Sequence, residues 1–175
     1  MKRFAILCLL ASLAMGAPLL AVQQPEKEVE VRVDDMQSTP YGVSITLRAT
    51  QTDDQLHMMI GVSEGQAIAR ALSHRTTLRP MTHDLIATIL QRIGWRVQKV
   101  LIRGVSESTF LADLVLEKEG ETKVIDARPS DAMAIAVRSG AKIFVNPQVF
   151  EAERERMEQE PRPRPAPSER EGIHL

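Results

Sequence analysis

Two stretches of this 175-residue chain begin with Arg-Pro and then place a hydroxyl group and a carboxylate within a few residues. Residues 79–84 read Arg-Pro-Met-Thr-His-Asp, and residues 128–131 read Arg-Pro-Ser-Asp. Apolar residues at helical spacing follow both, so each stretch is predicted to lead into a helix. Arginine can bind phosphate through two parallel hydrogen bonds, and histidine and carboxylates can transfer protons. The pattern is therefore suited to phosphate-ester chemistry at helix starts.

The same residues also have a structural explanation, which the sequence leaves open. Ser130 and Thr82 are typical helix caps, because hydroxyl oxygens accept hydrogen bonds from amides at a helix start. Asp131 is favourable at the positive end of the helix dipole, and Arg128 can pair with a neighbouring acid. Ser63, with a glutamine three residues later, matches a capping box before a third helix. Capping accounts for the hydroxyls and the acids, but not for the arginines or the histidine.

Acidic side chains stand near three predicted helix starts, so they can meet if these starts converge in space. The acids are Glu64, Asp84, Asp126 and Asp131, and the neighbouring arginines are Arg79, Arg128 and Arg138. Carboxylate oxygens suit hard ions such as Mg²⁺ or Mn²⁺. Such an ion activates water and clamps a phosphodiester, while arginine neutralises developing charge. One metal-assisted site is therefore predicted, on the assumption that the helix starts converge.

The composition excludes several other classes of function. The 22 Lys and Arg residues are offset by 23 Asp and Glu residues, for a net charge of −1, so no broad basic surface is expected. Aromatic residues make up 3% of the chain, which disfavours a stacking platform for single strands. The one cysteine, Cys8, lies in an N-terminal apolar run, so thiolate catalysis, disulfides and cysteine-bound zinc are excluded once that run is removed. His57, His74 and His174 lack ligand-like spacing and are interpreted as ordinary histidines.

Both ends of the chain are predicted to lie outside the folded domain. Lys2 and Arg3 precede an apolar run and then small residues, the order of a secretory signal peptide, which we place at residues 1–21. The run is too short for a comfortable membrane span, so we expect an exported protein, periplasmic or extracellular, without a stable span after cleavage. Residues 22–28 are predicted to be a linker, and residues 151–175, rich in Glu, Arg and Pro, a disordered tail.

Hydrophobic periodicity predicts one α+β domain over residues 29–150. The predicted order is three strands, two helices, three strands, one helix and one strand. Because the strands are short and joined by tight turns, we expect a mostly antiparallel sheet of about seven strands with three main helices.

Five motifs occur in the order and spacing of a known domain family. They are Ile60-Gly61, Glu64-Gly65-x-Ala67-Ile68, Arg79-Pro80-x-Thr82-His83-Asp84-Leu85, Phe110-x-Ala112-x-Leu114 and Ile125-Asp126-Ala127-Arg128-Pro129-Ser130-Asp131-Ala132-x-Ala134. With both Arg-Pro stretches present, residues 29–150 resemble the bifunctional nuclease domain. The resemblance implies an α+β fold, a homo-oligomer, and cleavage of DNA and RNA. It places the site among the ionisable residues of these motifs.

We therefore predict a nuclease that hydrolyses phosphodiester bonds of DNA or RNA, assisted by Mg²⁺ or Mn²⁺. Asp126 and Asp131 are expected to hold the ion, and His83 to act as general acid or base. The predicted catalytic residues are His83, Asp84, Glu64, Asp126 and Asp131, and the predicted substrate-binding residues are Arg79, Arg128, Ser130 and Arg138.

An alternative of a different class is a non-catalytic, oligomeric binding or scaffold domain. In that case the Arg-Pro motifs are structural caps and ion pairs that hold the fold or a subunit contact. The mild net acidity and the few aromatic residues favour this alternative.

Overall fold

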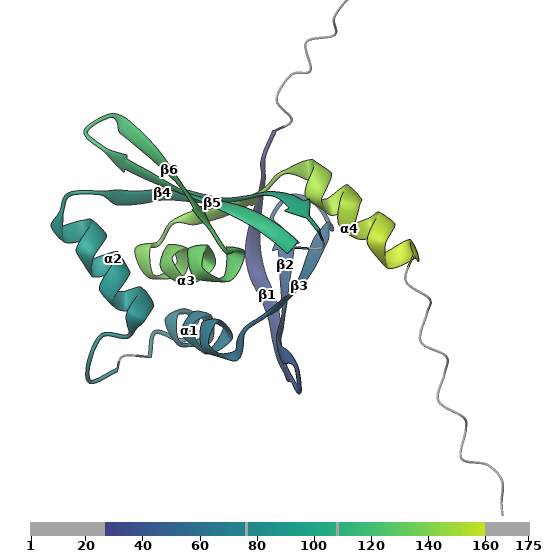
Figure 1. Cartoon of the computed structure of the whole chain (residues 1–175), viewed down its shortest axis with the longest axis horizontal. Helices are drawn as coiled ribbons and strands as arrows, with labels where there is room; N and C mark the ends of the chain where they lie inside the picture. The colour runs from purple at the N-terminus through teal and green to yellow at the C-terminus, as the bar shows by residue number, and fades with distance from the viewer. Residues whose placement is uncertain (1–26, 76, 108, 160–175) are drawn as a thin grey trace, which may run out of the picture.

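A computed structural model of the chain describes residues 27–75, 77–107 and 109–159, which form one sheet flanked by helices (Figure 1). The strands are β1 (Val29–Thr39), β2 (Gly42–Ala49), β3 (Gln55–Ile60), β4 (Arg96–Ser106), β5 (Thr109–Lys118), β6 (Glu121–Ala127) and β7 (Lys142–Val145). The helices are α1 (Val62–Leu72), α2 (Thr82–Arg92), α3 (Pro129–Ser139) and α4 (Pro147–Gln159). The α+β class and the seven strands, in the predicted order, are confirmed.

The sheet is mixed, where a mostly antiparallel sheet was predicted. Its order is β3-β2-β1-β7-β4-β5-β6, and only the β4–β7 pair is parallel among the described strands. The chain crosses from the edge strand β6 through α3 before it returns as β7, between β1 and β4. A crossover through a helix can place a strand parallel to its neighbour, which a tight hairpin cannot do.

The described part of the chain contains four helices, not three, and α4 overturns the predicted start of the tail. Residues 151–159 continue this helix, although their composition is mostly charged. Val149 and Phe150 are buried and anchor its first turns, and Glu153 is 3% exposed. The tail beyond residue 159, the predicted signal peptide and most of the linker lie outside the described residues. No helix among the described residues is long and apolar enough to cross a membrane.

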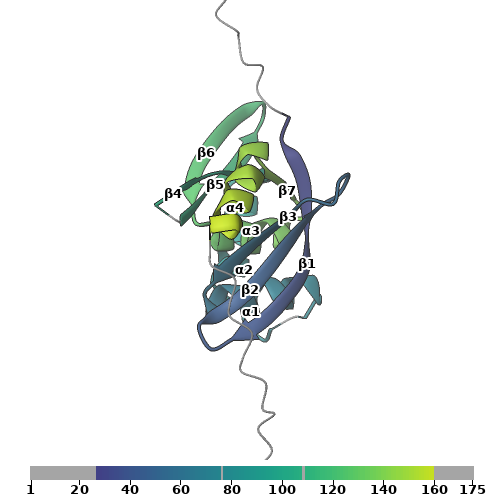
Figure 2. The same cartoon turned by 90° about the vertical axis from the view of Figure 1, so that its right-hand side faces the viewer.

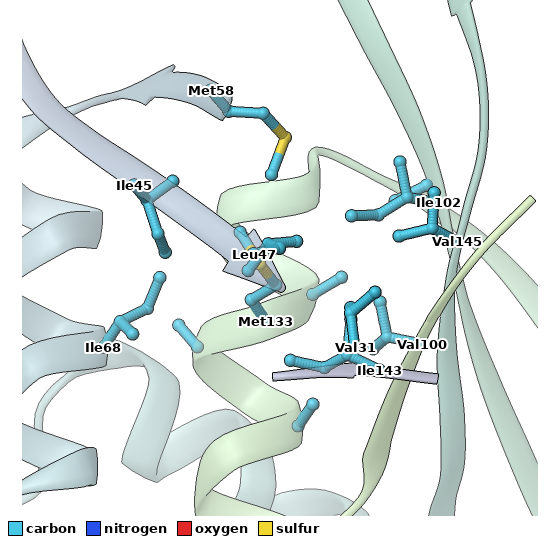
Figure 3. Packing of buried hydrophobic residues seen from close by; sticks show 14 of the residues in the cluster. Val31, Ile45, Leu47, Met58, Ile68, Val100, Ile102, Met133, Ile143 and Val145 are labelled. Carbon is cyan, nitrogen blue, oxygen red and sulfur yellow. The ribbon is translucent and has the colours of Figure 1, made fainter. Parts of the chain in front are cut away.

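The sheet is strongly curved, with α1, α2 and α3 packed together beside it (Figure 1). Helix α4 lies in front of α3 in Figure 2, between the β1–β3 and β4–β6 parts of the sheet, and its Val149 and Phe150 belong to the same buried core as α3. Helix α3 is the central one, because most of its residues are buried. In Figure 3, Met133 of α3 lies among Ile45 and Leu47 of β2 and Ile68 of α1. Its alanines let α3 approach the sheet closely, and Gly140, with a left-handed φ of 67°, ends it. Helix α2, by contrast, has no buried residue.

The three predicted caps are wrong in detail. The N-cap residues of α1, α2 and α3 are Gly61, Met81 and Arg128, and none has a side-chain cap hydrogen bond. Ser63, Thr82 and Ser130 lie one or two positions inside their helices. Proline at the first position of α3 explains the shift there, because its fixed φ suits a helix start and its missing N–H needs no partner.

Candidate functional site

Arg128 joins the starts of two helices. From the junction of β6 and α3, its Nη2 donates a hydrogen bond to Glu64 Oε1 of α1 over 2.8 Å. Its Nε donates to Asp131 Oδ2 in the first turn of α3 over 2.6 Å. The Arg128 side chain remains 66% exposed, so its other N–H groups can reach solvent or a ligand.

His83 brings the third helix start to the same place. Its Nε2 lies 3.1 Å from Asp131 Oδ1, which connects α2 to α3. The His83 side chain is 12% exposed. Glu64, His83, Arg128 and Asp131 thus form one continuous set of contacts, which we call the Arg128 network. The predicted convergence of helix starts is correct for these four residues.

Glycine at position 61 leaves room for this network. A Cβ atom at Gly61 would lie 2.2 Å from Glu64 Oε2, too close for both to keep their positions. The φ of Gly61 is −63°, which any residue can adopt. Glycine is therefore needed here for the space that its missing side chain leaves, and not for its backbone conformation.

The charges of the Arg128 network are closely coupled. Burial opposes ionisation of Asp131, but hydrogen bonds from Arg128 and His83 outweigh it and hold the pKa of Asp131 below its ordinary value. Hydrogen bonds to Asp131 and Glu64 raise the pKa of Arg128, which stays charged at every accessible pH. Two carboxylates around one guanidinium leave a net charge of minus one when His83 is neutral.

Asp84 and Arg138 form a separate ion pair next to the Arg128 network. Arg138 Nε donates to Asp84 Oδ1, which ties the last turn of α3 to the first turn of α2. Asp84 Oδ2 also accepts a hydrogen bond from the Met81 backbone N–H over 2.8 Å. Burial opposes ionisation of Asp84, but these hydrogen bonds hold its pKa below the ordinary value. With Arg138 only 10% exposed, this pair is positioned to hold two helices together.

Asp126 and Arg79 are not brought into the Arg128 network. Asp126, whose side chain is 78% exposed, pairs on the sheet with Arg103 Nη2 over 2.9 Å. Arg103 also donates through Nε to Asp113 of β5, so Asp126 belongs to a cross-strand cluster. Arg79 is exposed, and no hydrogen bond or ion pair joins its side chain to another described residue.

The acidic residues do not fit the divalent ion predicted from the sequence. Among the described residues, no three His, Asp or Glu side chains lie close enough together to hold a metal ion. The expected ligands Asp126 and Asp131 have different partners, and the carboxylates of Glu64 and Asp131 face a guanidinium. A cation and Arg128 would compete for the same oxygens, so no catalytic step is assigned to a metal.

A cleft of about 400 Å³ adjoins Arg128 on the side of β3 and α4. One wall is the start of α3, including the buried Ser130; the others come from β3, the β4–β5 hairpin and α4. The sequence did not point to His57, Glu153 or Arg156, which also line the cleft. They lie far along the chain from the Arg-Pro motifs, and no spacing rule connects them. We call this space the Arg128 cleft.

Comparison with known proteins places these features in a family. The model of the bifunctional nuclease domain matches residues 45–158, from within β2 to the end of α4. The chain belongs to this family. Relatives in two strains of Mycobacterium tuberculosis, both named uncharacterized proteins, are 37% identical over 121 residues, which cover 69% of this chain and 70% of theirs.

The bifunctional nuclease family also includes a more distant plant relative of this chain. Bifunctional nuclease 1 of Oryza sativa is 26% identical over 137 residues. The match covers 77% of this chain but only 40% of the rice protein. The resemblance noted from the Arg-Pro motifs is therefore confirmed at the level of the family.

Proposed function

We propose that this member of the bifunctional nuclease family is a nuclease that hydrolyses phosphodiester bonds of DNA or RNA at the Arg128 network. The observation that supports this proposal most directly is that both Arg-Pro motifs contribute to one network beside a cleft. Its histidine comes from the first motif, and its arginine and aspartate come from the second. The family name supports the same chemistry.

Arg128 is the group that binds phosphate in this proposal. A guanidinium has five N–H donors, and the contacts to Glu64 and Asp131 leave others for a ligand. The two carboxylates hold the guanidinium in place, and its exposed side can form a bidentate contact with phosphate oxygens. Since the whole chain has a net charge of −1, this local contact has to provide the attraction that a basic surface would otherwise supply.

His83 is the proton-transfer group, and Asp131 positions it. The Asp131 carboxylate holds Nε2 of His83, so the Nδ1 nitrogen is the one that exchanges a proton with water or the leaving oxygen. Asp131 also orients Arg128, which places the histidine and the phosphate-binding group in a fixed relation. Glu64 supports the guanidinium from the other side.

The test is cleavage of labelled DNA and RNA by His83→Gln, with His74→Gln as the matched control. His74 is exposed at the end of α1 and has no place in the network. Loss of general acid–base catalysis predicts a fall in kcat of about 100-fold or more for His83→Gln, whereas the control stays near wild type. Equal activity of the two variants would remove His83 from the mechanism.

The metal requirement is tested in the same assay with Mg²⁺, with Mn²⁺ and with a chelator. Because Arg128 occupies the carboxylates of Glu64 and Asp131, we expect cleavage to survive the chelator. Activity that disappears on chelation and returns with one ion would mean that these acids leave Arg128 to bind that ion.

A second candidate function is the scaffold or binding domain, which one specific observation favours. Glu64 and Asp84 lie in ion pairs that bridge helices, and Asp131 contacts His83 of α2, as structural residues would. Under this alternative the protein is a homo-oligomer, and Asp131→Asn dissociates or unfolds it. Sedimentation and melting of that variant, compared with Asp126→Asn, separate the alternatives: an inactive variant with intact assembly supports the nuclease.

Export remains part of the proposal, on the strength of the predicted signal peptide at residues 1–21. The substrate would then be nucleic acid outside the cytoplasm. Cell fractionation followed by detection of the chain tests this directly: recovery in the cytoplasm alone contradicts it.

A further inference from the structure

The Arg128 cleft has walls of mixed character. Apolar side chains line it from three elements: Met59 of β3 is 56% exposed, Val105 of β4 is 38% exposed, and Phe110 of β5 is partly buried. Polar residues also line the cleft, including Thr109 and His57. The cleft volume of about 400 Å³ falls in the range of small-molecule sites.

The charges of the cleft lie at two places. Arg128 provides an exposed guanidinium at one wall. At another wall, the buried carboxylate of Glu153 accepts hydrogen bonds from Arg156 Nε over 2.9 Å and Nη2 over 2.8 Å. The opposite charges of Glu153 and Arg156 offset each other. The exposed N–H groups of Arg128 can therefore donate hydrogen bonds to an anion at that wall, and the rest of the cleft suits an uncharged group.

A nucleotide has both of these properties. Its phosphate is an anion, and its base is flat and uncharged, with apolar faces and polar edges. Methionine and phenylalanine side chains pack well against such a ring, and hydroxyl groups can bond to its edge. We propose that the Arg128 cleft holds one unpaired nucleobase of the substrate, next to the phosphate bound by Arg128, so that the protein selects single-stranded nucleic acid. This inference rests on the proposed nuclease function.

Strand selection follows from the cost of reaching the cleft. A base inside a duplex is stacked and paired, and its extrusion costs a few kcal/mol. A base of a single strand enters at much lower cost. Duplex substrate would contact Arg128 through phosphate alone and lose the contacts of the cleft.

The experiment measures binding by fluorescence anisotropy, separately from cleavage. The probes are a labelled eight-nucleotide single strand, a hairpin duplex of the same sequence, and the single strand with abasic sites throughout. We expect the wild-type protein to bind the single strand about tenfold or more tightly than either other probe, as expected for one stacked base. Equal binding of the abasic strand would reduce the contact to phosphate and overturn the proposal.

Met59→Trp places a larger side chain in the wall of the cleft and keeps the arginine at position 128. We expect it to weaken binding of the single strand about tenfold and to leave duplex binding unchanged. The matched control is Val124→Trp, at a 61% exposed position of β6 that does not line the cleft. Met59→Ser, which removes the apolar wall, replaces the tryptophan variant if that variant melts early. A change no larger than that of the control contradicts the role of the cleft.

Failure of this inference can be told apart from failure of the nuclease function. A wild-type protein that cleaves single strands and duplexes equally, with Met59→Trp unchanged, remains a nuclease without a base site. A protein that prefers the single strand in the binding assay but cleaves neither probe has the base site without the activity.

Discussion

The two Arg-Pro motifs share their local sequence but differ in what each contributes to the site. In the second motif, Arg128 is the centre of the Arg128 network. In the first, Arg79 is exposed and has no side-chain hydrogen bond or ion pair with another described residue. The first motif contributes through His83 and Asp84 instead.

The difference follows from the helices that the motifs begin. Helix α3 is buried against the sheet along most of its length, so Arg128 at its start faces α1 at close range. Helix α2 has no buried residue, and near its start Asp84 contacts Arg138 of α3. An Arg-Pro pair thus predicts a helix start, whereas the packing of that helix decides whether the arginine has partners.

Substitution of Arg128 and of Arg79 should show the difference between the two motifs most clearly. Arg128→Ala removes the proposed phosphate contact, and we expect kcat/KM to fall about 100-fold or more. Arg79→Ala should stay within about threefold, because its side chain joins no network of the described residues. Kinetics on one fluorogenic oligonucleotide measure both variants. Equal losses would mean that both motifs bind substrate.

The Asp84–Arg138 pair should matter for stability and not for phosphate binding. Arg138→Ala leaves the Asp84 carboxylate without its main partner, and we expect a loss of about 1.5–3 kcal/mol in the free energy of unfolding. Arg92→Ala, at an exposed position at the end of α2, is the control and should change it by less than about 0.5 kcal/mol. Chemical denaturation, combined with Asp84→Ala in a double-mutant cycle, isolates the pair; a coupling near zero would show that it is not structural.

Acid unfolding should distinguish Asp131 from Asp126. Burial works against the Asp131 carboxylate, but Arg128 and His83 hold its folded-state pKa below 3.8, the ordinary value. The charged form therefore stabilises the fold above about pH 4, and this stability is lost as the pH falls through the lower, folded-state pKa.

Melting from pH 7 down to pH 3 checks this expectation. In Asp131→Asn, the free energy of unfolding should fall less between pH 7 and pH 3 than in the wild type. The difference should be on the order of 1 kcal/mol, since Asp131 is partly exposed. Asp126→Asn, at a highly exposed position, should leave the dependence close to that of the wild type. The same shape of curve in all three proteins would contradict the role given to the Asp131 contacts.

The smallest expected effect concerns Gly61, which precedes α1. In Gly61→Ala, the new methyl group displaces the Glu64 carboxylate from Arg128. Because this carboxylate is the flexible end of a side chain, we expect a stability change of about 0.5 kcal/mol or less, with a measurable rise in KM.

Gly104→Ala is the matched control for Gly61→Ala. A Cβ atom at Gly104 would have no neighbour within 4 Å, so nothing has to move. Denaturation and steady-state kinetics of both variants provide the comparison. A KM that is unchanged by Gly61→Ala would show that Glu64 is not needed to orient Arg128.

Much of the fold could be predicted from the chain alone. Alternation and helical spacing placed the seven strands and the first three helices in the correct order. The parallel placement of β7 could not be predicted, because it depends on where α3 directs the chain after β6. Nor could the length of α4, since two buried residues, Val149 and Phe150, outweigh a charged composition that is typical of disorder.

The sequence by itself determined the family, the helix starts to within two residues, and the residue types of the candidate site. Local rules suffice for these, because Arg-Pro, a hydroxyl and an acid constrain only the backbone around them. Tertiary structure alone decided that Glu64, His83 and Asp131 meet at Arg128, while Asp126 pairs with Arg103 and Arg79 stays apart. Residues 64 positions apart, such as Glu64 and Arg128, come together only when α1 and α3 pack on the same sheet.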